Sequence, residues 1–473
     1  MFSHTVQLLD VQNRKIIPFL DVNQALCAQT MNIFSTYLVF YPFLDYLCTM
    51  RVLIVNTSER TGGAALAANR LMEALNNNGV KAKMLVRDKE TEALTVVGLN
   101  KGWLSHWHFL KERWAIFAGL HFNKKHLFEV DIANSGFDIT GMREFREADI
   151  IHLSWINQGM LSLSDIKKIL DSGKPVVWTM HDAWPATAIC HYPHGCKAFT
   201  TTCRRCRLLP GHGGQNDLAN RVWNRKKQIL DRHHISFVAC SRWLEQQAKQ
   251  SALIAQHSIT NIPNPIDIRV FRPMDKQGAR QRLGLPEDKR LILFVSQRVT
   301  DERKGMSYLM DAMNHLIGEK PDVKDRIAVA ILGGHAEDFE GKMPLPVYPL
   351  GYVSDEKKIV DVYNAVDVFV LPSLEDNLPN TIMEAMACGI PCVGFKTGGI
   401  PEEIDHKKNG YVAEYRHAED LAHGIQWVLD EADYASLSAQ AVKKVATHYS
   451  QNSVSLRYIE VYNQALAYKH YSL

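Results

Sequence analysis

The sequence has little excess charge. Its 54 lysine and arginine residues nearly balance 51 aspartate and glutamate residues, which leaves a formal net charge of +3. No global basic field therefore exists to draw the protein to nucleic acid, and any anion-binding surface has to be local. We expect no nucleic-acid partner.

Long apolar runs are also missing. The most apolar early stretch, residues 33–47, falls short of the roughly 20 residues of a membrane helix and contains Pro42 and Asp45. No charged start followed by an apolar core and a small-residue cleavage site opens the sequence. We expect a cytoplasmic protein. Residues 1–49 are predicted to be an N-terminal extension outside the fold, because a strand-like run begins only after Met50.

What is present is ordinary globular composition, with 46% hydrophobic and 22% charged residues. A chain of 473 residues exceeds what one hydrophobic core usually serves, so we expect more than one domain. Apolar strand-like runs alternate with helical patterns, which predicts parallel sheets with right-handed crossovers. The first series of predicted elements is strand 51–56, a turn at Gly62 and Gly63, helix 64–78, strand 149–153, helix 164–171 and strand 175–180. The second series has strands at 291–296, 327–332, 366–371 and 391–395.

Residues 261–273 separate the two series and contain three prolines, which suits a hinge. The fold class is therefore α/β, with two facing Rossmann-like, doubly wound parallel-sheet domains and an interdomain cleft. The first domain is predicted to span residues 50–262 and the second residues 263–448. Residues 449–473 are expected to form a C-terminal helix that packs back toward the first domain. Ligands of such sheets bind beyond the carboxyl ends of the strands, which places the site in the cleft.

The most informative stretch is residues 371–403, which runs through strand, loop, helix, strand and glycine turn. Asn380 is predicted to cap a helix over residues 381–388, so backbone N–H groups converge on a place suited to an anion. Glu384 follows early in that helix. Its carboxylate can accept hydrogen bonds from the two hydroxyls of a ribose, or it can simply favour the helix dipole.

Two cations follow the first strand of the second domain, Arg298 and Lys304, with Arg303 beside them. Fixed cations there would stabilise the negative charge that a nucleoside diphosphate leaving group develops. The alternative is a solvated basic turn. Because the sequence contains no Asp-x-Asp pair, these cations would take the place of a divalent metal.

Together these residues resemble the family 4 glycosyltransferases, which have the GT-B fold, and the resemblance covers roughly residues 50–470. The family's two acidic residues separated by seven others correspond to Asp376 and Glu384, followed by residues 385–389. The first acidic residue is usually Glu in the family. Here it is Asp376 with Glu375 beside it, so either carboxylate is a candidate contact of the donor sugar. Further matches are Arg298 and Lys304, the hinge motif at 264–267 and the acid-flanked glycine turn at 398–402.

The resemblance implies a retaining, metal-independent transferase that moves a sugar from a nucleotide diphosphate sugar to a glycan or lipid-linked acceptor in cell-surface polysaccharide synthesis. It assigns the diphosphate to Arg298 and Lys304, the ribose to Glu384, and the sugar to Asp376 or Glu375. The remaining expected donor contacts are Gly62, Gly63, Asn377, Leu378 and Gly399. Two alternatives stay open, a nucleotide-sugar epimerase of the same fold and a catalytically silent scaffold.

The family commonly places a histidine of a His-x-His pattern near the transferred sugar. This sequence has His152-Leu153-Ser154 instead. His181, which follows the strand at 175–180, is the first candidate for that contact and His152 is the second. A lone histidine at a strand end is more often structural, so the third alternative is that neither acts.

A cysteine-rich loop spans residues 190–206. Four thiolates so close in sequence suit a structural zinc ion, and the alternative is four reduced thiols in a packed loop. A zinc-ribbon module for nucleic acid is disfavoured because the loop lies inside a Rossmann-like domain. The predicted ligands are Cys190, Cys196, Cys203 and Cys206.

Residues 101–125 place aromatic and leucine side chains at three- and four-residue spacing among basic residues. Such a face can lie on the anionic head groups of a bilayer, which would suit a lipid-linked acceptor at the inner face of the membrane. The alternative is that the stripe packs into the domain core. The residues concerned are Trp103, Trp107, Leu110, Trp114 and Phe117, with Lys111, Arg113, Lys124 and Lys125.

Overall fold

The computed structural model describes residues 8–9, 16–17, 50–99 and 102–471. Residues 1–49 form a unit of their own, separate from residues 50–473. Within that first unit, β1 (Leu8–Leu9) pairs antiparallel with β2 (Ile16–Ile17). Apart from these two strands, the predicted N-terminal extension lies outside the described residues, as does the apolar stretch 33–47. Among the described residues, none of the helices is long and apolar enough to cross a membrane.

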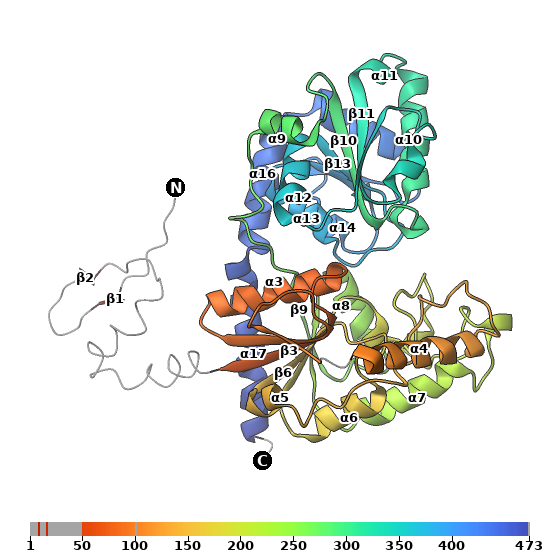
Figure 1. The fold of residues 1–473 in the computed structure, drawn as a ribbon, viewed down its shortest axis with the longest axis vertical. Coiled ribbons are helices and arrows are strands. Elements are labelled where there is room, and N and C mark those ends of the chain that lie inside the picture. Colours follow the sequence, from red (N-terminus) through yellow and green to blue (C-terminus); the bar gives the residue numbers. More distant parts are fainter. Residues whose placement is uncertain (1–7, 10–15, 18–49, 100–101, 472–473) are drawn as a thin grey trace. The chain divides into compact units, whose positions relative to one another are not determined.

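The first Rossmann-like domain is built on a seven-stranded, all-parallel sheet (Figure 1). The interior strand β3 (Arg51–Ser58) is buried over most of its length, and four consecutive apolar residues, Val52 to Val55, form its middle. In spatial order the strands are β5 (Val96–Gly98), β4 (Lys81–Asp88), β3 (Arg51–Ser58), β6 (Ile150–Leu153), β7 (Val176–Met180), β8 (Ser236–Ala239) and β9 (Ser258–Asn261). The helices are α3 (Gly63–Asn77), α4 (Gly102–Gly119), α5 (Arg143–Glu147), α6 (Leu163–Asp171), α7 (Leu218–Leu230) and α8 (Arg242–Lys249).

The second domain repeats the arrangement with a six-stranded parallel sheet. Its strands in spatial order are β12 (Val347–Gly351), β11 (Ile327–Gly334), β10 (Arg290–Arg298), β13 (Val368–Leu371), β14 (Cys392–Phe395) and β15 (Gly410–Ala413). The helices are α9 (Lys276–Leu283), α10 (Met306–Glu319), α11 (Val323–Arg326), α12 (Glu356–Ala365), α13 (Asn380–Ala387), α14 (Ile400–Glu403) and α15 (Ala418–Gln426). Two core clusters cover the faces of this sheet. The predicted α/β class with two parallel-sheet domains is confirmed.

The chain returns to the first domain at its end. Helix α16 (Tyr434–His448) packs on α13, and α17 (Gln451–Tyr471) packs against α3 and β7 of the first domain (Figure 1). Two tyrosines of α17 hydrogen-bond into the first sheet. The Tyr458 hydroxyl lies 3.0 Å from Thr179 Oγ1, and the Tyr462 hydroxyl lies 2.6 Å from His152 Nδ1. Helix α17 thus forms a second connection between the two domains, in addition to the hinge at residues 261–273.

Candidate functional site

The loop between β13 and α13, residues 372–379, is called the acidic loop here, and it carries a buried carboxylate that contacts two cations. Lys304 Nζ lies 2.6 Å from Asp376 Oδ2, and an Arg303 nitrogen lies 3.7 Å from the same oxygen. Ser373 donates a further hydrogen bond of 3.2 Å. Burial raises the pKa of Asp376, but Lys304 and Arg303 outweigh it and leave that pKa below its ordinary value. Asp376 is therefore a carboxylate at neutral pH.

The glycine turn after β14 presses against this loop. Gly398 has φ of +54°, and a Cβ there would lie 1.7 Å from the carbonyl oxygen of Asp376. A Cβ on Gly399 would lie 2.0 Å from the carbonyl oxygen of Asn377. Only glycine allows the two backbones to approach this closely. The predicted donor residues Asn377 and Gly399 are therefore in direct backbone contact.

The three cations at and after the end of β10 are placed differently from one another. Arg303 and Lys304 lie in a short 3-10 turn, Glu302–Lys304, next to the acidic loop. Arg303 Nη1 donates to the carbonyl oxygen of Glu375 at 2.8 Å. Arg298, at the end of β10, is exposed, and no side-chain ion pair engages it within the described ranges. Arg298 is thus open to solvent, whereas Arg303 and Lys304 already bind the loop.

Glu384 is buried and bonded on both oxygens. It accepts a hydrogen bond from Arg70 at 2.8 Å and another from the Tyr363 hydroxyl at 2.8 Å. Arg70 lies on α3 of the first domain and Tyr363 on α12 of the second. The side chains of Arg70 and Glu384 are 10% and 8% exposed. Glu384 therefore takes part in a buried ion pair between the domains, which the sequence did not predict. The available signal was Arg70 itself, which lies two helical turns after Gly63 on a helix whose residues are mainly apolar.

The predicted helix cap is wrong. Helix α13 begins at Asn380 itself, Pro379 occupies the cap position, and no side chain caps the helix. The Asn380 side chain is used elsewhere, because its amide nitrogen donates to the carbonyl oxygen of Gly63 at 2.9 Å and its oxygen accepts from Asn264 at 2.9 Å. Asn380 therefore links the glycine turn of the first domain to the hinge segment. Gly62, with φ of +95°, precedes the first residue of α3.

Further polar contacts join the acidic loop to the first domain. Asn377 donates to the carbonyl oxygen of His181 at 3.0 Å and accepts from Ser241 at 2.5 Å.

Glu402, in the acid-flanked turn, accepts from the backbone N–H groups of Arg242 and Trp243, each at 2.8 Å. Those N–H groups begin α8, so Glu402 stabilises a helix N-terminus of the opposite domain. Leu378 is buried in the core of the second domain.

The two candidate histidines occupy different environments. His181 is half-buried after β7, and its Nε2 lies 2.9 Å from the Ser154 hydroxyl. Burial lowers the pKa of His181 to about 4, so its ring is neutral at pH 7. His152 is 1% exposed and has both ring nitrogens engaged, by Tyr462 and by Thr179 at 2.8 Å. Burial lowers the pKa of His152 to about 3. His152 is thus built into the contact with α17, and Ser154 orients His181.

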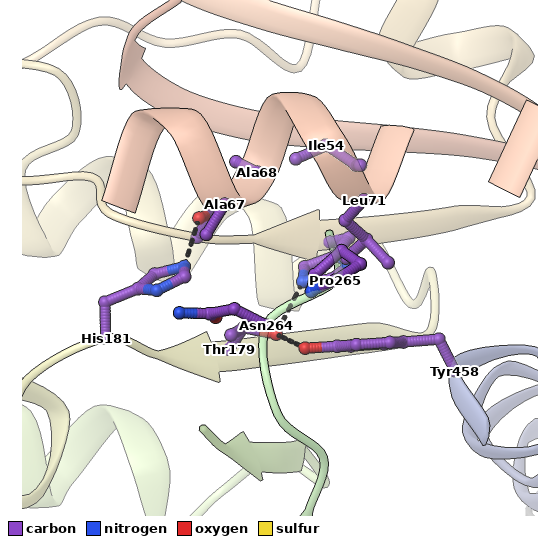
Figure 2. A pocket seen from close by; sticks show the side chains of 11 residues that line it. Ile54, Ala67, Ala68, Leu71, Thr179, His181, Asn264, Pro265 and Tyr458 are labelled. Carbon is purple, nitrogen blue, oxygen red and sulfur yellow. Dashed lines mark hydrogen bonds between the residues drawn. The ribbon is translucent and has the colours of Figure 1, made fainter. Parts of the chain in front are cut away.

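A small cavity lies beside His181, between the first sheet and the hinge. Figure 2 shows Ala67 and Leu71 of α3 on one side, and Thr179 and His181 on the other. Asn264 of the hinge completes the lining there. This cavity does not include the acidic loop.

The cysteine-rich loop does not bring its thiols together as a tetrahedral set. Within the described residues, no three of the sulfur atoms of Cys190, Cys196, Cys203 and Cys206 lie within 4.8 Å of one another. Burial raises the pKa of Cys190 and of Cys203 to about 12, which keeps these thiols protonated when no metal is bound. As placed, the four residues do not fit a bound zinc ion, and the zinc site stays a prediction from the sequence.

Helix α4 presents its aromatic side chains outward. Trp103, Trp107 and Trp114 are 77%, 57% and 66% exposed, and Leu110 and Lys111 on the same face are exposed as well. The alternative that this stripe packs into the core is wrong for these residues, although Phe117 is half-buried.

The basic residues near α4 divide into two groups. Arg113 is buried and ion-paired with Asp131, so it does not belong to the surface. Lys124 and Lys125, by contrast, are exposed. The only acidic residue among residues 102–128 is Glu112, which is buried. The exposed face of α4 is therefore aromatic and basic, with no acidic side chain of its own.

Sequence comparison matches part of the chain to a known family. Residues 289–431 match the family model described as glycosyl transferases group 1. A D-inositol 3-phosphate glycosyltransferase of Thermobispora bispora is 29% identical over 222 residues, which cover 44% of this chain and 51% of the relative. The chain spans about half the length of the first curated relatives it matches.

Solved structures with the same fold cover most of the chain. Sucrose-phosphate synthase from Thermosynechococcus elongatus superposes with a TM-score of 0.61 at 18% identity, covering 88% of this chain and 99% of that chain. An Anabaena protein crystallised with UDP and glucose gives 0.58 at 17% identity, covering 88% and 100%. At these identities the superpositions establish the fold. The fold is the GT-B fold. The match of residues 289–431 and the curated relatives indicate similarity to the group 1 glycosyltransferases, in line with the family 4 resemblance of the sequence.

Proposed function

We propose that the protein is a retaining, metal-independent glycosyltransferase that takes a sugar from a nucleotide diphosphate sugar. The observation that carries the proposal is the contact between Lys304 and Asp376, 2.6 Å apart. It brings the predicted diphosphate cation and the predicted sugar carboxylate to one place at the carboxyl ends of adjacent strands, β10 and β13. That edge of a doubly wound sheet is where such folds bind their ligands.

The cations supply the electrostatic part of the mechanism. As the bond between the sugar and the diphosphate breaks, negative charge grows on the leaving phosphate. Lys304 and the exposed Arg298 then stabilise the transition state more than the ground state. Arg303 holds the acidic loop through the Glu375 carbonyl. With Lys304 and Arg298 in this role, the proposed mechanism uses no divalent metal. Retention would follow from acceptor attack on the face that the phosphate leaves.

The carboxylates and His181 would position the donor. Asp376 or Glu375 accepts hydrogen bonds from the sugar hydroxyls, and Glu384 is assigned to the ribose. Because Arg70 and Tyr363 occupy both Glu384 oxygens, ribose binding requires the Arg70 contact to be exchanged or shared. A neutral His181 carries one N–H, and its Nε2 lies 2.9 Å from the Ser154 hydroxyl while its Nδ1 lies 3.6 Å from Cys240 Sγ, so donation to a sugar hydroxyl requires one of these contacts to be exchanged. The structural neighbour crystallised with UDP and glucose makes a UDP-sugar the first donor to test.

The acceptor is proposed to be a glycan or lipid-linked sugar, used in cell-surface polysaccharide synthesis and met at the cytoplasmic face of a membrane. The exposed aromatic and basic face of α4 supports this proposal. Tryptophan rings insert at the level of the lipid head groups, and lysines are drawn to anionic lipids. The absence of an acidic residue on that face removes the repulsion that an anionic bilayer would otherwise meet.

The proposal is tested with a panel of UDP-, GDP- and ADP-sugars in the presence of EDTA. A nucleotide sugar that raises the melting temperature and is turned over despite EDTA supports it, provided that Lys304→Ala loses turnover. Formation of a free epimerised sugar without acceptor would assign the protein to the epimerases instead.

A further inference from the structure

Residues 191–194 of the first domain form a segment that contacts the Glu375 carboxylate of the second domain. In the cysteine-rich loop, His194 Nδ1 lies 2.9 Å from Glu375 Oε2, and the backbone nitrogen of His194 donates to Glu375 Oε1 at 3.4 Å. Both oxygens of the Glu375 carboxylate are therefore contacted by one residue of the opposite domain. A carboxylate held at two points loses much of its rotational freedom.

The same segment also contacts the cation that supports Glu375. The ring of Tyr192 lies under the Arg303 guanidinium, with 4.8 Å between the guanidinium carbon and the ring centroid. Arg303 in turn donates to the carbonyl oxygen of Glu375 at 2.8 Å. Tyr192 and His194 thus act on Glu375 from two sides, one through its backbone and one through its carboxylate.

The base of the segment is firmly anchored. His191 is buried between Asp182 and Asp131, with 2.7 Å from each ring nitrogen to a carboxylate oxygen. Lys226 donates to the carbonyl oxygens of Trp184 and Thr187, at 2.6 and 3.0 Å, just before the segment begins. A buried network with paired charges fixes one arrangement of the chain. Tyr192 and His194 therefore extend from a fixed support.

We propose that Tyr192 and His194 are positioning residues that set the Glu375 carboxylate and complete the part of the site that takes the donor sugar. The proposal rests on the proposed function, because it concerns the same site. The segment contacts Glu375 and Arg303, whereas the ribose and diphosphate are assigned to Glu384 and Lys304. These two positioning residues consequently select for the sugar part of the donor and leave recognition of the nucleotide unchanged.

Four variants and a control isolate this role. His194→Ala removes the side-chain donor, and His194→Asn restores one, because the asparagine amide nitrogen takes the place of Nδ1. Tyr192→Leu removes the aromatic ring under Arg303, and Tyr192→Phe keeps it. Lys197→Ala is the matched control, since Lys197 is an exposed residue of the same loop. The measurements are kcat and KM for the nucleotide sugar that the wild type turns over in the panel. Calorimetry gives the Kd of the corresponding nucleoside diphosphate alone.

A hydrogen bond to a charged group contributes enough that His194→Ala should raise KM for the nucleotide sugar about tenfold or more. The Kd of the nucleoside diphosphate should stay within about twofold, because its assigned partners are untouched. His194→Asn should have a KM closer to wild type than His194→Ala does, and Tyr192→Phe should have a KM closer to wild type than Tyr192→Leu does. Lys197→Ala should have the KM of wild type. Unchanged KM in His194→Ala, or equal weakening of nucleotide sugar and nucleoside diphosphate, would overturn the positioning role. A wild type that binds neither ligand would overturn the proposed function itself.

Discussion

Arg70 and Glu384, 314 positions apart in the chain, form a buried ion pair of 2.8 Å that joins α3 of the first domain to α13 of the second. The Tyr363 hydroxyl bonds the other carboxylate oxygen. Arg70 also lies over the ring of Phe271, 5.0 Å from its centroid, in the segment that connects the domains. The carboxylate assigned to the ribose is therefore also a structural contact between the domains.

Removing one partner of this pair should destabilise the protein. Arg70→Met leaves Glu384 buried without its cation, which typically costs about 3–5 kcal/mol of unfolding free energy. Urea denaturation measures this change. The double variant Arg70→Met/Glu384→Gln should lose less than the sum of the two single losses, because the two residues interact directly. Arg143→Ala is the control, since it breaks an exposed ion pair with Glu147 and should leave unfolding unchanged. Additive losses in the double variant would contradict the pairing.

Lys304 should matter for the chemical step more than for donor binding. Lys304→Ala removes a cation assigned to the leaving phosphate, and loss of one such group typically lowers kcat about 100- to 1000-fold. Steady-state kinetics with the accepted nucleotide sugar tests this. Lys320→Ala, in the same domain but after α10, serves as a control. A Lys304→Ala variant that keeps its kcat would contradict the assignment.

Glu403 predicts a pH dependence of stability. It is fully buried, and neither of its side-chain oxygens has a hydrogen-bond partner. Burial, with the nearby charge of Asp376, raises its pKa well above the ordinary value of 4.5. The folded protein therefore binds this proton more tightly than the unfolded chain. Its contribution to stability is complete below pH 4.5 and declines as the pH rises above it.

Glu403→Gln should remove this decline. The variant is expected to match wild type near pH 4.5 and to exceed it at alkaline pH, because only Glu403 has a raised pKa that opposes folding as the unfolded chain loses its proton. Urea unfolding at a series of pH values measures the difference. Glu414→Gln, with a 67% exposed side chain, is the control. Parallel pH profiles for Glu403→Gln and wild type would contradict the protonated state of Glu403.

The aromatic face of α4 should bind anionic vesicles. Replacing Trp103, Trp107 and Trp114 with serine removes the exposed rings and should weaken co-sedimentation with phosphatidylglycerol-containing vesicles at least about tenfold. Tyr352→Ser, which removes a 63% exposed aromatic residue of the second domain, should bind as wild type does. Wild-type protein that co-sediments with neither anionic nor neutral vesicles would contradict the membrane contact.

The sequence predicted those parts of the fold that depend on local pattern. The run at 51–56 and its glycine turn correspond to β3 and α3, because an apolar run followed by glycines and a helical period determines a strand–turn–helix unit. The proximity of Lys304 and Asp376 was also predictable, because both follow strands of one sheet. Strand β4 was not predicted, although lysines alternate with apolar residues over its first half as they do in a half-buried strand.

Contacts between the domains could not be predicted from local sequence patterns. The partners Arg70 and Glu384, or His194 and Glu375, meet only through the docking of two folded domains, which no spacing encodes. Asn380 illustrates the consequence. Its residue type favours a helix cap, yet docking gives its side chain two partners in Gly63 and Asn264 that outweigh this local preference.

The most direct test of the account is turnover of UDP-, GDP- and ADP-sugars by wild type in EDTA, with the anomeric configuration of the product read by NMR. The account predicts that one nucleotide sugar is used at a rate that EDTA does not change, and that the product keeps the anomeric configuration of the donor. Turnover that EDTA abolishes and added divalent metal restores, or a product of inverted configuration, would contradict it.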